Sequence, residues 1–196
     1  MKYAPSLALV FMFVVAPVTA QVSGSINRDA PVVTSSITFK DQSKLDVSYT
    51  AIHFGEGSWQ SIVENEDRHE RFNGFAARKP IGSVSTTKLV MAAGREIPAG
   101  DYDMFFTVSK RAGGFILNLK DKGSDADPIR WRMVLVDTDV DIKRMKIRLD
   151  PADAANAAQL TIAFGKKSVS VPVTEKSADA DKSDADKAGG EKSADR

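Results

Sequence analysis

Hydrophobic and polar residues alternate along most of the chain between residues 45 and 173. Leu45, Val47, Tyr49 and Ala51 alternate with polar residues, and the same period of two returns further along the chain. The later alternating segments are 102–108, 115–119, 131–135, 145–149, 160–164 and 169–173. Because successive side chains of a β-strand point to opposite faces, this pattern predicts antiparallel strands with one buried face.

Turn residues separate these segments at spacings typical of hairpins. Glycine-containing turns lie at 94–100, 111–114 and 165–167, and the last of them joins the final two strands. Helix signals are fewer: residues 62–72 predict a short helix, and residues 150–158 predict one or two turns, with an aspartate N-cap followed by proline. About nine or ten short strands predict an all-β fold, an antiparallel β-sandwich with at most one or two short helices. A closed β-barrel is the alternative.

Residues 1–20 have the features of a secretory signal peptide. Lys2 is followed by an apolar run, Leu7–Ala16, and by small residues at Val18 and Ala20. A charged start, a short apolar region and a small-residue exit are typical of a signal that is cleaved, here after Ala20. Ten apolar residues are too few to cross a bilayer, which needs about 20. We therefore expect an exported protein, periplasmic or extracellular, without a transmembrane segment.

The last segment, residues 175–196, differs in composition from the rest. It repeats lysine, serine, alanine and aspartate, and contains seven acidic and five basic residues but no aromatic or branched aliphatic residue. With nothing apolar to bury, such a segment cannot offset the entropy lost on ordering its backbone. We predict a disordered charged tail, which leaves residues 21–174 as the β-sandwich domain.

Composition narrows the classes of function. The 196-residue chain contains no cysteine and carries a formal net charge of +1. The absence of cysteine excludes a disulfide framework, a thiol nucleophile and a thiolate metal site. The balanced charge gives no reason to expect nucleic acid as a partner.

Three segments share features with known proteins: Gly94–Tyr102 has the pattern glycine-x-x-[Leu/Ile]-proline-alanine-glycine-x-tyrosine, Leu160–Val173 is predicted to form a hairpin, and Leu45–Tyr49 an early strand. They resemble the strand entry, the closing hairpin and the early strand of a bacterial secreted family, domain of unknown function 2911. The resemblance covers most of residues 32–174 and implies a secreted β-sandwich-like domain. It implies no reaction, because the family itself has no assigned activity.

The sequence also departs from the family pattern. The family's tryptophan-arginine-x-glycine-alanine-asparagine segment is matched here only at Arg78 and Gly82. The resemblance favours Arg78, Tyr49 and Tyr102 as ligand-binding residues, although both tyrosines could be purely structural.

Metal-assisted hydrolysis is the alternative function. His53 and His69 are the only histidines, and with Glu66 they could supply metal ligands. The alternating charges around Glu66 and His69 are instead typical of a solvated helix or loop. The aspartates at 137, 139 and 141 lack the glycine and glutamate of a calcium loop, so they predict a solvated strand or turn. No serine-hydrolase elbow and no phosphate-binding glycine loop occur.

The remaining candidates concern binding. Residues 143–148 form the densest basic stretch, which is typical of an edge strand and could meet an anionic partner. Trp131 lies in an alternating segment and is predicted to be core, whereas Trp59 follows two glycines and is the better exposed platform for a ligand. We expect a non-enzymatic domain without cofactor, which binds a ligand or an envelope partner through loops at one end. Tyr102 is predicted to be buried, because Pro98 and Gly100 form a rigid turn before it.

Overall fold

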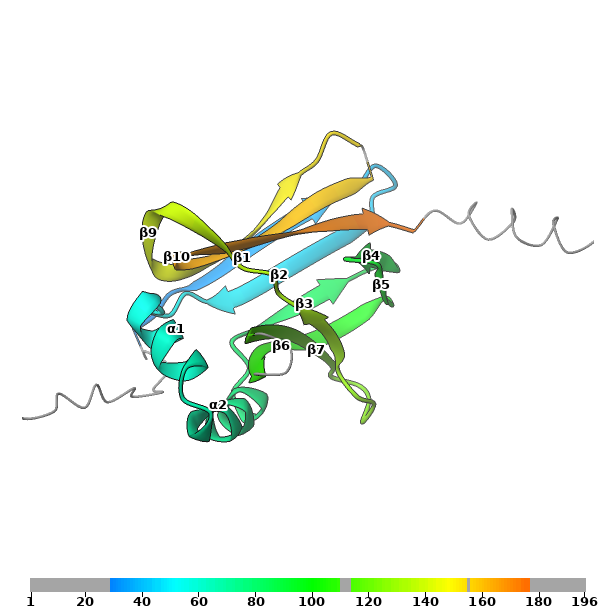
Figure 1. Cartoon of the computed structure of the whole chain (residues 1–196). Coiled ribbons are helices and arrows are strands. Elements are labelled where there is room, and N and C mark those ends of the chain that lie inside the picture. The colour runs from blue at the N-terminus through cyan, green and yellow to red at the C-terminus, as the bar shows by residue number, and fades with distance from the viewer. Residues whose placement is uncertain (1–28, 110–113, 155, 177–196) are drawn as a thin grey trace, which may run out of the picture.

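The alternating segments form β-strands in two antiparallel sheets that pack face to face (Figure 1). The computed structural model describes residues 29–109, 114–154 and 156–176. One sheet has the order β1 (Val32–Thr38), β2 (Lys44–Thr50), β3 (Gly82–Thr86), β6 (Gly100–Ser109), β7 (Gly114–Asp121) and β8 (Ile129–Arg132). The other has the order β5 (Arg95–Ile97), β4 (Val90–Ala92), β10 (Ala157–Glu175) and β9 (Val136–Pro151). The predicted sandwich is confirmed, and the sheets do not close into the alternative barrel.

The long strand β10 folds back on itself at Gly165. The hydroxyl oxygens of Thr161 and Ser170 are 3.2 Å apart, and the N–H of Glu175 donates to the carbonyl of Asn156 at 2.9 Å. Because a straight strand rises about 3.3 Å per residue, these contacts require two antiparallel arms, which are seen side by side in Figure 1. Gly165 has φ of +52°, a conformation that favours glycine. The predicted hairpin at 165–167 is therefore confirmed.

The predicted helix over residues 150–158 is wrong. Strand β9 continues to Pro151, and Asp150 and Pro151 lie opposite Gln159 and Ala158 of the first arm of β10. Only a short turn remains between the strands, in which the N–H of Ala157 donates to the carbonyl of Ala154 at 3.0 Å. Strand pairing on both sides leaves too few residues for a helix, whose first turn is costly to nucleate.

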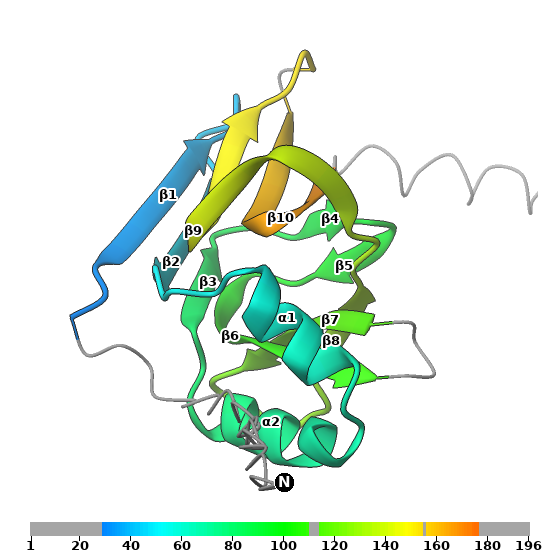
Figure 2. The ribbon, with the colours of Figure 1, turned by 60° about the vertical axis from the view of Figure 1, so that its left-hand side comes forward.

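Two helices, α1 (Glu56–Val63) and α2 (Asp67–Arg78), replace the single helix predicted at 62–72. A break at residues 64–66 separates them, and Figure 2 shows α1 in front of the strands and α2 at the lower end of the view. In α2, the Asn73 side chain donates to the Val108 carbonyl at 2.9 Å and accepts from the Val108 N–H at 2.7 Å. These two bonds attach α2 to β6. No helix among the described residues is long and apolar enough to cross a membrane.

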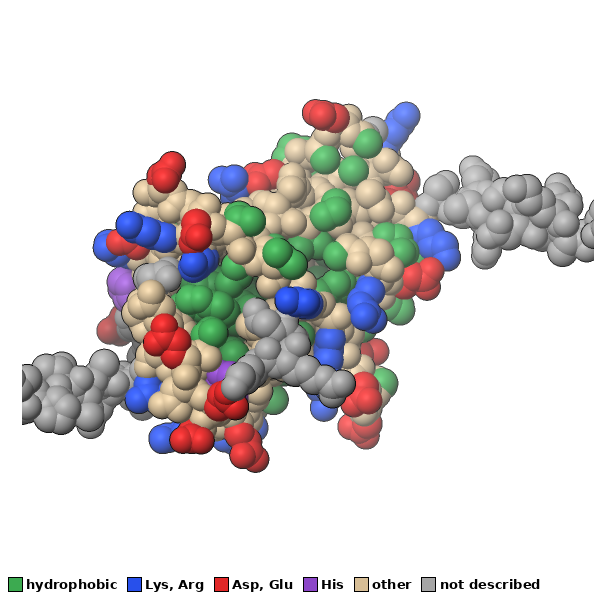
Figure 3. Space-filling model, in the orientation of Figure 1, with side chains coloured by type: hydrophobic (Ala, Val, Ile, Leu, Met, Phe, Trp, Pro, Cys, Tyr) green, Lys and Arg blue, Asp and Glu red, His purple; other side chains and the backbone are tan. Residues whose placement is uncertain are grey.

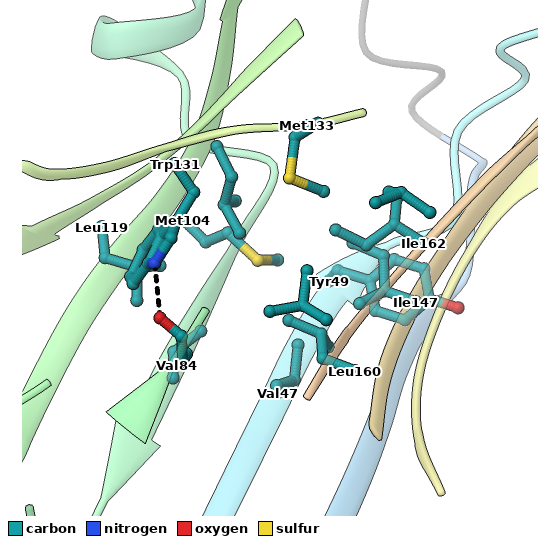
Figure 4. Close-up of a cluster of buried hydrophobic side chains, with 14 of the residues drawn as sticks. Val47, Tyr49, Val84, Met104, Leu119, Trp131, Met133, Ile147, Leu160 and Ile162 are labelled. Carbon is teal, nitrogen blue, oxygen red and sulfur yellow. Dashed lines mark hydrogen bonds between the residues drawn. The ribbon is translucent and has the colours of Figure 1, made fainter. Parts of the chain in front are cut away.

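Inward-facing side chains of both sheets form one core (Figure 4). Trp131 is 5% exposed, which confirms it as core, and its indole N–H donates to the Ala92 carbonyl at 2.8 Å, joining β8 to β4. On the other side of the sandwich, the N–H of Leu149 donates to Ser35 Oγ at 2.8 Å, joining β9 to β1. Hydrogen bonds therefore connect the sheets along both long sides.

Tyr102 is buried, as predicted. Its side chain is 3% exposed, and its hydroxyl donates to the Pro98 carbonyl at 2.8 Å. Burial, and then the charge of Asp121, raise the pKa of the Tyr102 hydroxyl. On the neighbouring strand β3, Gly82 lies so close to β2 that a Cβ atom would overlap the carbonyl oxygen of Ser48. Tyr102 therefore packs in the core between the sheets, whereas Gly82 permits the close approach of β3 and β2 within one sheet.

The two ends of the chain are described only in part. The predicted signal peptide, and residues 177–196 of the predicted tail, lie outside the described residues. Glu175 and Lys176, predicted to belong to the tail, instead continue the fold. Glu175 lies opposite Val90 in the sheet, and the N–H of Lys176 is 3.3 Å from the carbonyl of Leu89. The folded part therefore extends two residues beyond the expected boundary.

Candidate functional site

One end of the sandwich carries a cavity of about 260 Å³ beside α1. Its lining comes from α1, from the start of β7, from the connection between β8 and β9, and from the turn of β10. The lining residues are Trp59, Phe115, Arg132, Met133, Val134, Leu135 and Lys167. Figure 3 shows hydrophobic side chains gathered on one face of the molecule, with both basic and acidic side chains around them. We call this hollow the Trp59 cavity.

Core aromatic rings hold the Trp59 indole in place. Its ring centroid lies 4.9 Å from that of Phe115 in an edge-to-face arrangement and 5.6 Å from that of Phe164. Phe115 and Phe164 are almost fully buried, whereas Trp59 is only partly buried. The backbone of Gly114 runs so close to the indole that a Cβ atom at this position would lie 3.5 Å from the ring. Trp59 is thus a fixed ring that borders both the core and the cavity, and it is more exposed than Trp131, as expected from the sequence, although still partly buried.

Two cations line the same cavity from opposite sheets. Arg132 ends β8 and Lys167 lies in the turn of β10. Lys167 forms an ion pair with Asp137, whose side chain is 82% exposed, while that of Lys167 is 23% exposed. Within the described ranges, Arg132 forms no ion pair. The described lining has an apolar floor, where Phe115 and Met133 are 1% and 3% exposed, and it contains no carboxylate.

The other predicted ligand-binding residues do not gather at this cavity. Tyr49 and Tyr102 are 4% and 3% exposed, so both are core side chains that a ligand cannot reach without rearrangement of the fold. Arg78 is exposed in the last turn of α2 and lies outside the cavity lining. Of the four candidates, Trp59 is the one that lines this cavity.

The histidines are each engaged with backbone. His53 Nδ1 lies 3.3 Å from the Lys143 carbonyl, and His69 Nε2 lies 3.3 Å from the Val63 carbonyl. Glu66 lines an open polar depression between α1 and α2. In the part of the chain that the structure describes, no three histidine, aspartate or glutamate side chains converge as a metal site would require. Among these described residues, His53, His69 and Glu66 therefore do not form one group.

Strand β9 places the aspartate and basic stretches at a sheet edge. Asp137, Asp139 and Asp141 are exposed, as expected for a solvated strand. Lys143 is ion-paired with Asp141, and Arg148 Nε donates to Asp150 at 2.7 Å. The sequence correctly predicts an edge strand here, and its charges are partly neutralised by neighbours along the same strand.

A second hollow, of about 570 Å³, lies on the outer face of the six-stranded sheet beside α2. Lys120 and Arg130 line it, together with Asn118, which is 2% exposed. The Asn118 amide donates at 3.0 Å to Thr107 Oγ1 and at 3.0 Å to the Ile116 carbonyl. These bonds satisfy the buried amide without any ligand. This hollow therefore gives a weaker argument for binding than the Trp59 cavity does.

A group of three charges lies at the end of the sandwich away from α1 (Figure 1). Lys88 is ion-paired with Asp41, and its Nζ lies 3.7 Å from Glu175 Oε1. The hydrogen bond from Lys88 holds the pKa of Asp41 well below its usual range. A hydrogen bond with the Asp41 carboxylate raises the pKa of Glu175, because the Glu175 carboxyl group must keep its proton to donate it, and burial and the charge of Asp41 act in the same direction. All three side chains are accessible to solvent, so this group connects the β1–β2 turn to β10 through ion pairs at the surface.

Comparison with known proteins finds no family model, no curated protein and no solved structure that matches the chain. The resemblance to the domain of unknown function 2911 family therefore stays a prediction. Sequence reasoning found Trp59 but missed Arg132 and Lys167, which lie 35 residues apart (167 − 132). The basic turn containing Lys167 is visible in the sequence, but nothing in it indicates that the turn meets the end of β8.

Proposed function

We propose that the chain is an exported, non-enzymatic β-sandwich domain that binds a small ligand with an apolar face in the Trp59 cavity. The observation that carries the proposal is the partly buried indole of Trp59, which core rings fix at the wall of a solvent-accessible cavity. A rigid indole offers a large apolar surface, and little conformational entropy is lost when a ligand packs on it. Signal-peptide features and the family resemblance support export to the periplasm or beyond.

The size of the cavity restricts the ligand. Sites for drug-sized molecules measure roughly 300–1,000 Å³, and the Trp59 cavity measures about 260 Å³. A single ring or a short alkyl chain therefore suits it better than an oligosaccharide or a folded partner. An envelope protein could still present one such side chain to the cavity.

The two tryptophans provide a test with an internal control. We would titrate isotope-labelled protein with phenylethanol and follow both indole N–H signals by NMR, assigning them with Trp131→Phe. The Trp59 signal should shift and saturate, because its ring lines the cavity. The Trp131 signal should stay in place, because that indole is buried and bonded to Ala92. A Trp59 signal that does not move up to the solubility limit of phenylethanol would contradict ligand binding at this cavity.

Export is tested separately. Mass spectrometry of the protein recovered from outside the cytoplasm should give Gln21 as the N-terminal residue. An intact Met1 on exported protein, or retention in the cytoplasm, would contradict the signal-peptide prediction and leave the binding proposal to the titration.

A further inference from the structure

We infer that the ligand of the Trp59 cavity is an amphipathic carboxylate, whose apolar body packs on Trp59 and whose carboxylate binds Arg132 and Lys167. This inference rests on the proposed function and adds the chemical class of the ligand. It depends on the two cations, which the proposal for an apolar ligand does not need.

The placement of the two cations favours an anion. Arg132 and Lys167 come from opposite sheets and line a single small cavity, together with five uncharged side chains. Like charges that share a partly enclosed space repel one another, and an anion between them removes this repulsion. The guanidinium of Arg132 has no ion-pair partner among the described residues, so it can offer a carboxylate two parallel N–H donors.

One partner of Lys167, Asp137, shows which side of the cavity faces solvent. Asp137 contacts the ammonium group with a side chain that is 82% exposed, so it approaches from the rim and does not fill the cavity. A ligand carboxylate would share or replace this contact. Asp137 is therefore a competitor for Lys167, and its removal should strengthen the binding of an anionic ligand.

The apolar part of the ligand follows from the floor and the rim. Phe115 and Met133 are buried at the floor, and Val134 is 69% exposed at the mouth, where it could cover a bound apolar group. A small anion such as acetate would leave these apolar surfaces in contact with water. A neutral ring would leave Arg132 without a partner. A ring or short chain that ends in a carboxylate satisfies both parts of the cavity.

The test compares three probes on the same protein. Phenylacetate carries the ring and the charge, phenylethanol the ring alone, and acetate the charge alone. We expect phenylacetate to bind about tenfold more tightly than phenylethanol, which corresponds to one charge-assisted hydrogen bond. Acetate should not shift the Trp59 indole signal in the millimolar range.

Three variants separate a specific contact from general attraction. Arg132→Gln should remove the preference for phenylacetate over phenylethanol, and the midpoint of urea unfolding should stay unchanged because Arg132 is exposed and supports no core packing. Arg130→Gln is the matched control, since Arg130 is an exposed arginine on the same strand that lies outside this cavity. Asp137→Asn should tighten phenylacetate binding severalfold and leave phenylethanol binding unchanged.

The outcomes distinguish this inference from the proposed function. If phenylethanol shifts Trp59 and phenylacetate binds no more tightly, the carboxylate inference is wrong and the apolar site stands. If Arg130→Gln and Arg132→Gln weaken phenylacetate equally, the preference reflects overall charge, and the inference is again wrong. If no probe shifts the Trp59 signal, the proposed function itself fails.

Discussion

Replacing Tyr102 by alanine should destabilise the domain by about 3–5 kcal/mol, the cost of truncating a large buried aromatic side chain. Tyr102 is 3% exposed at the start of β6, on the face that packs against the second sheet. Truncation would leave a cavity that rigid neighbouring strands cannot fill. In urea unfolding, the variant should have a lower midpoint than the unchanged protein. The slope should be the same, because both proteins expose a similar surface on unfolding.

Tyr102→Phe separates the ring from the hydroxyl. The phenylalanine keeps the buried ring but loses the 2.8 Å hydrogen bond to the Pro98 carbonyl. We expect a cost of about 1 kcal/mol, the usual net value of one such bond. If Tyr102→Ala costs less than about 1 kcal/mol, the side chain is not core and the assigned register of β6 is off by one residue. If Tyr102→Phe costs as much as Tyr102→Ala, the hydroxyl and not the ring provides the stability.

Three further predictions test other parts of the fold. Gly82→Ala should destabilise the domain by roughly 3 kcal/mol in urea unfolding, because the new Cβ atom would overlap the adjacent strand. Gly57→Ala in α1 is the control and should be neutral or stabilising. Equal effects of the two substitutions would contradict the predicted overlap. Asp41→Asn should lower the raised pKa of Glu175 in an NMR pH titration. A carboxyl group whose pKa is raised in the folded state adds to stability below its unfolded-state pKa, and this contribution is lost as the pH rises through its folded-state pKa. The variant should no longer show this pH-dependent loss of stability. Deleting residues 177–196 should leave the melting temperature nearly unchanged, and a drop of several degrees would show that the tail docks on the domain.

The strands with regular alternation, such as β2, β6 and β7, could be predicted because their signal is local, whereas no alternating segment identified β1, β3, β4 or β5. Alternation in a segment such as 102–108 identifies both the strand and its buried face without knowledge of its neighbours. The failed helix at 150–158 shows the opposite case. Its aspartate, proline and alanines suit a helix, but pairing with the first arm of β10 decided the conformation. Helix and strand propensities depend on the local sequence, so they cannot predict a conformation that is set by pairing with another strand.

The candidate site was predictable only at Trp59. The glycines before Trp59 indicated exposure, and the structure shows an indole that is half in the core. Arg132 and Lys167 become neighbours of this ring because β10 turns back at Gly165 and β8 ends beside α1. The sequence contains the turn but not the position of the turn against the other sheet, and that position creates the cavity.

The same aromatic ring serves both stability and the proposed binding, which determines how the site must be tested. Trp59 packs edge-on against Phe115 at 4.9 Å, so truncating it would remove core contacts together with the cavity wall. Lost binding in such a variant would therefore not distinguish a missing platform from a loosened end of the sandwich. Arg132 lines the same cavity but is exposed, so its replacement changes the chemistry of the site and leaves the core intact. A change in the preference for the carboxylate probe, at constant stability, thus reports on the cavity itself and not on the fold that holds it.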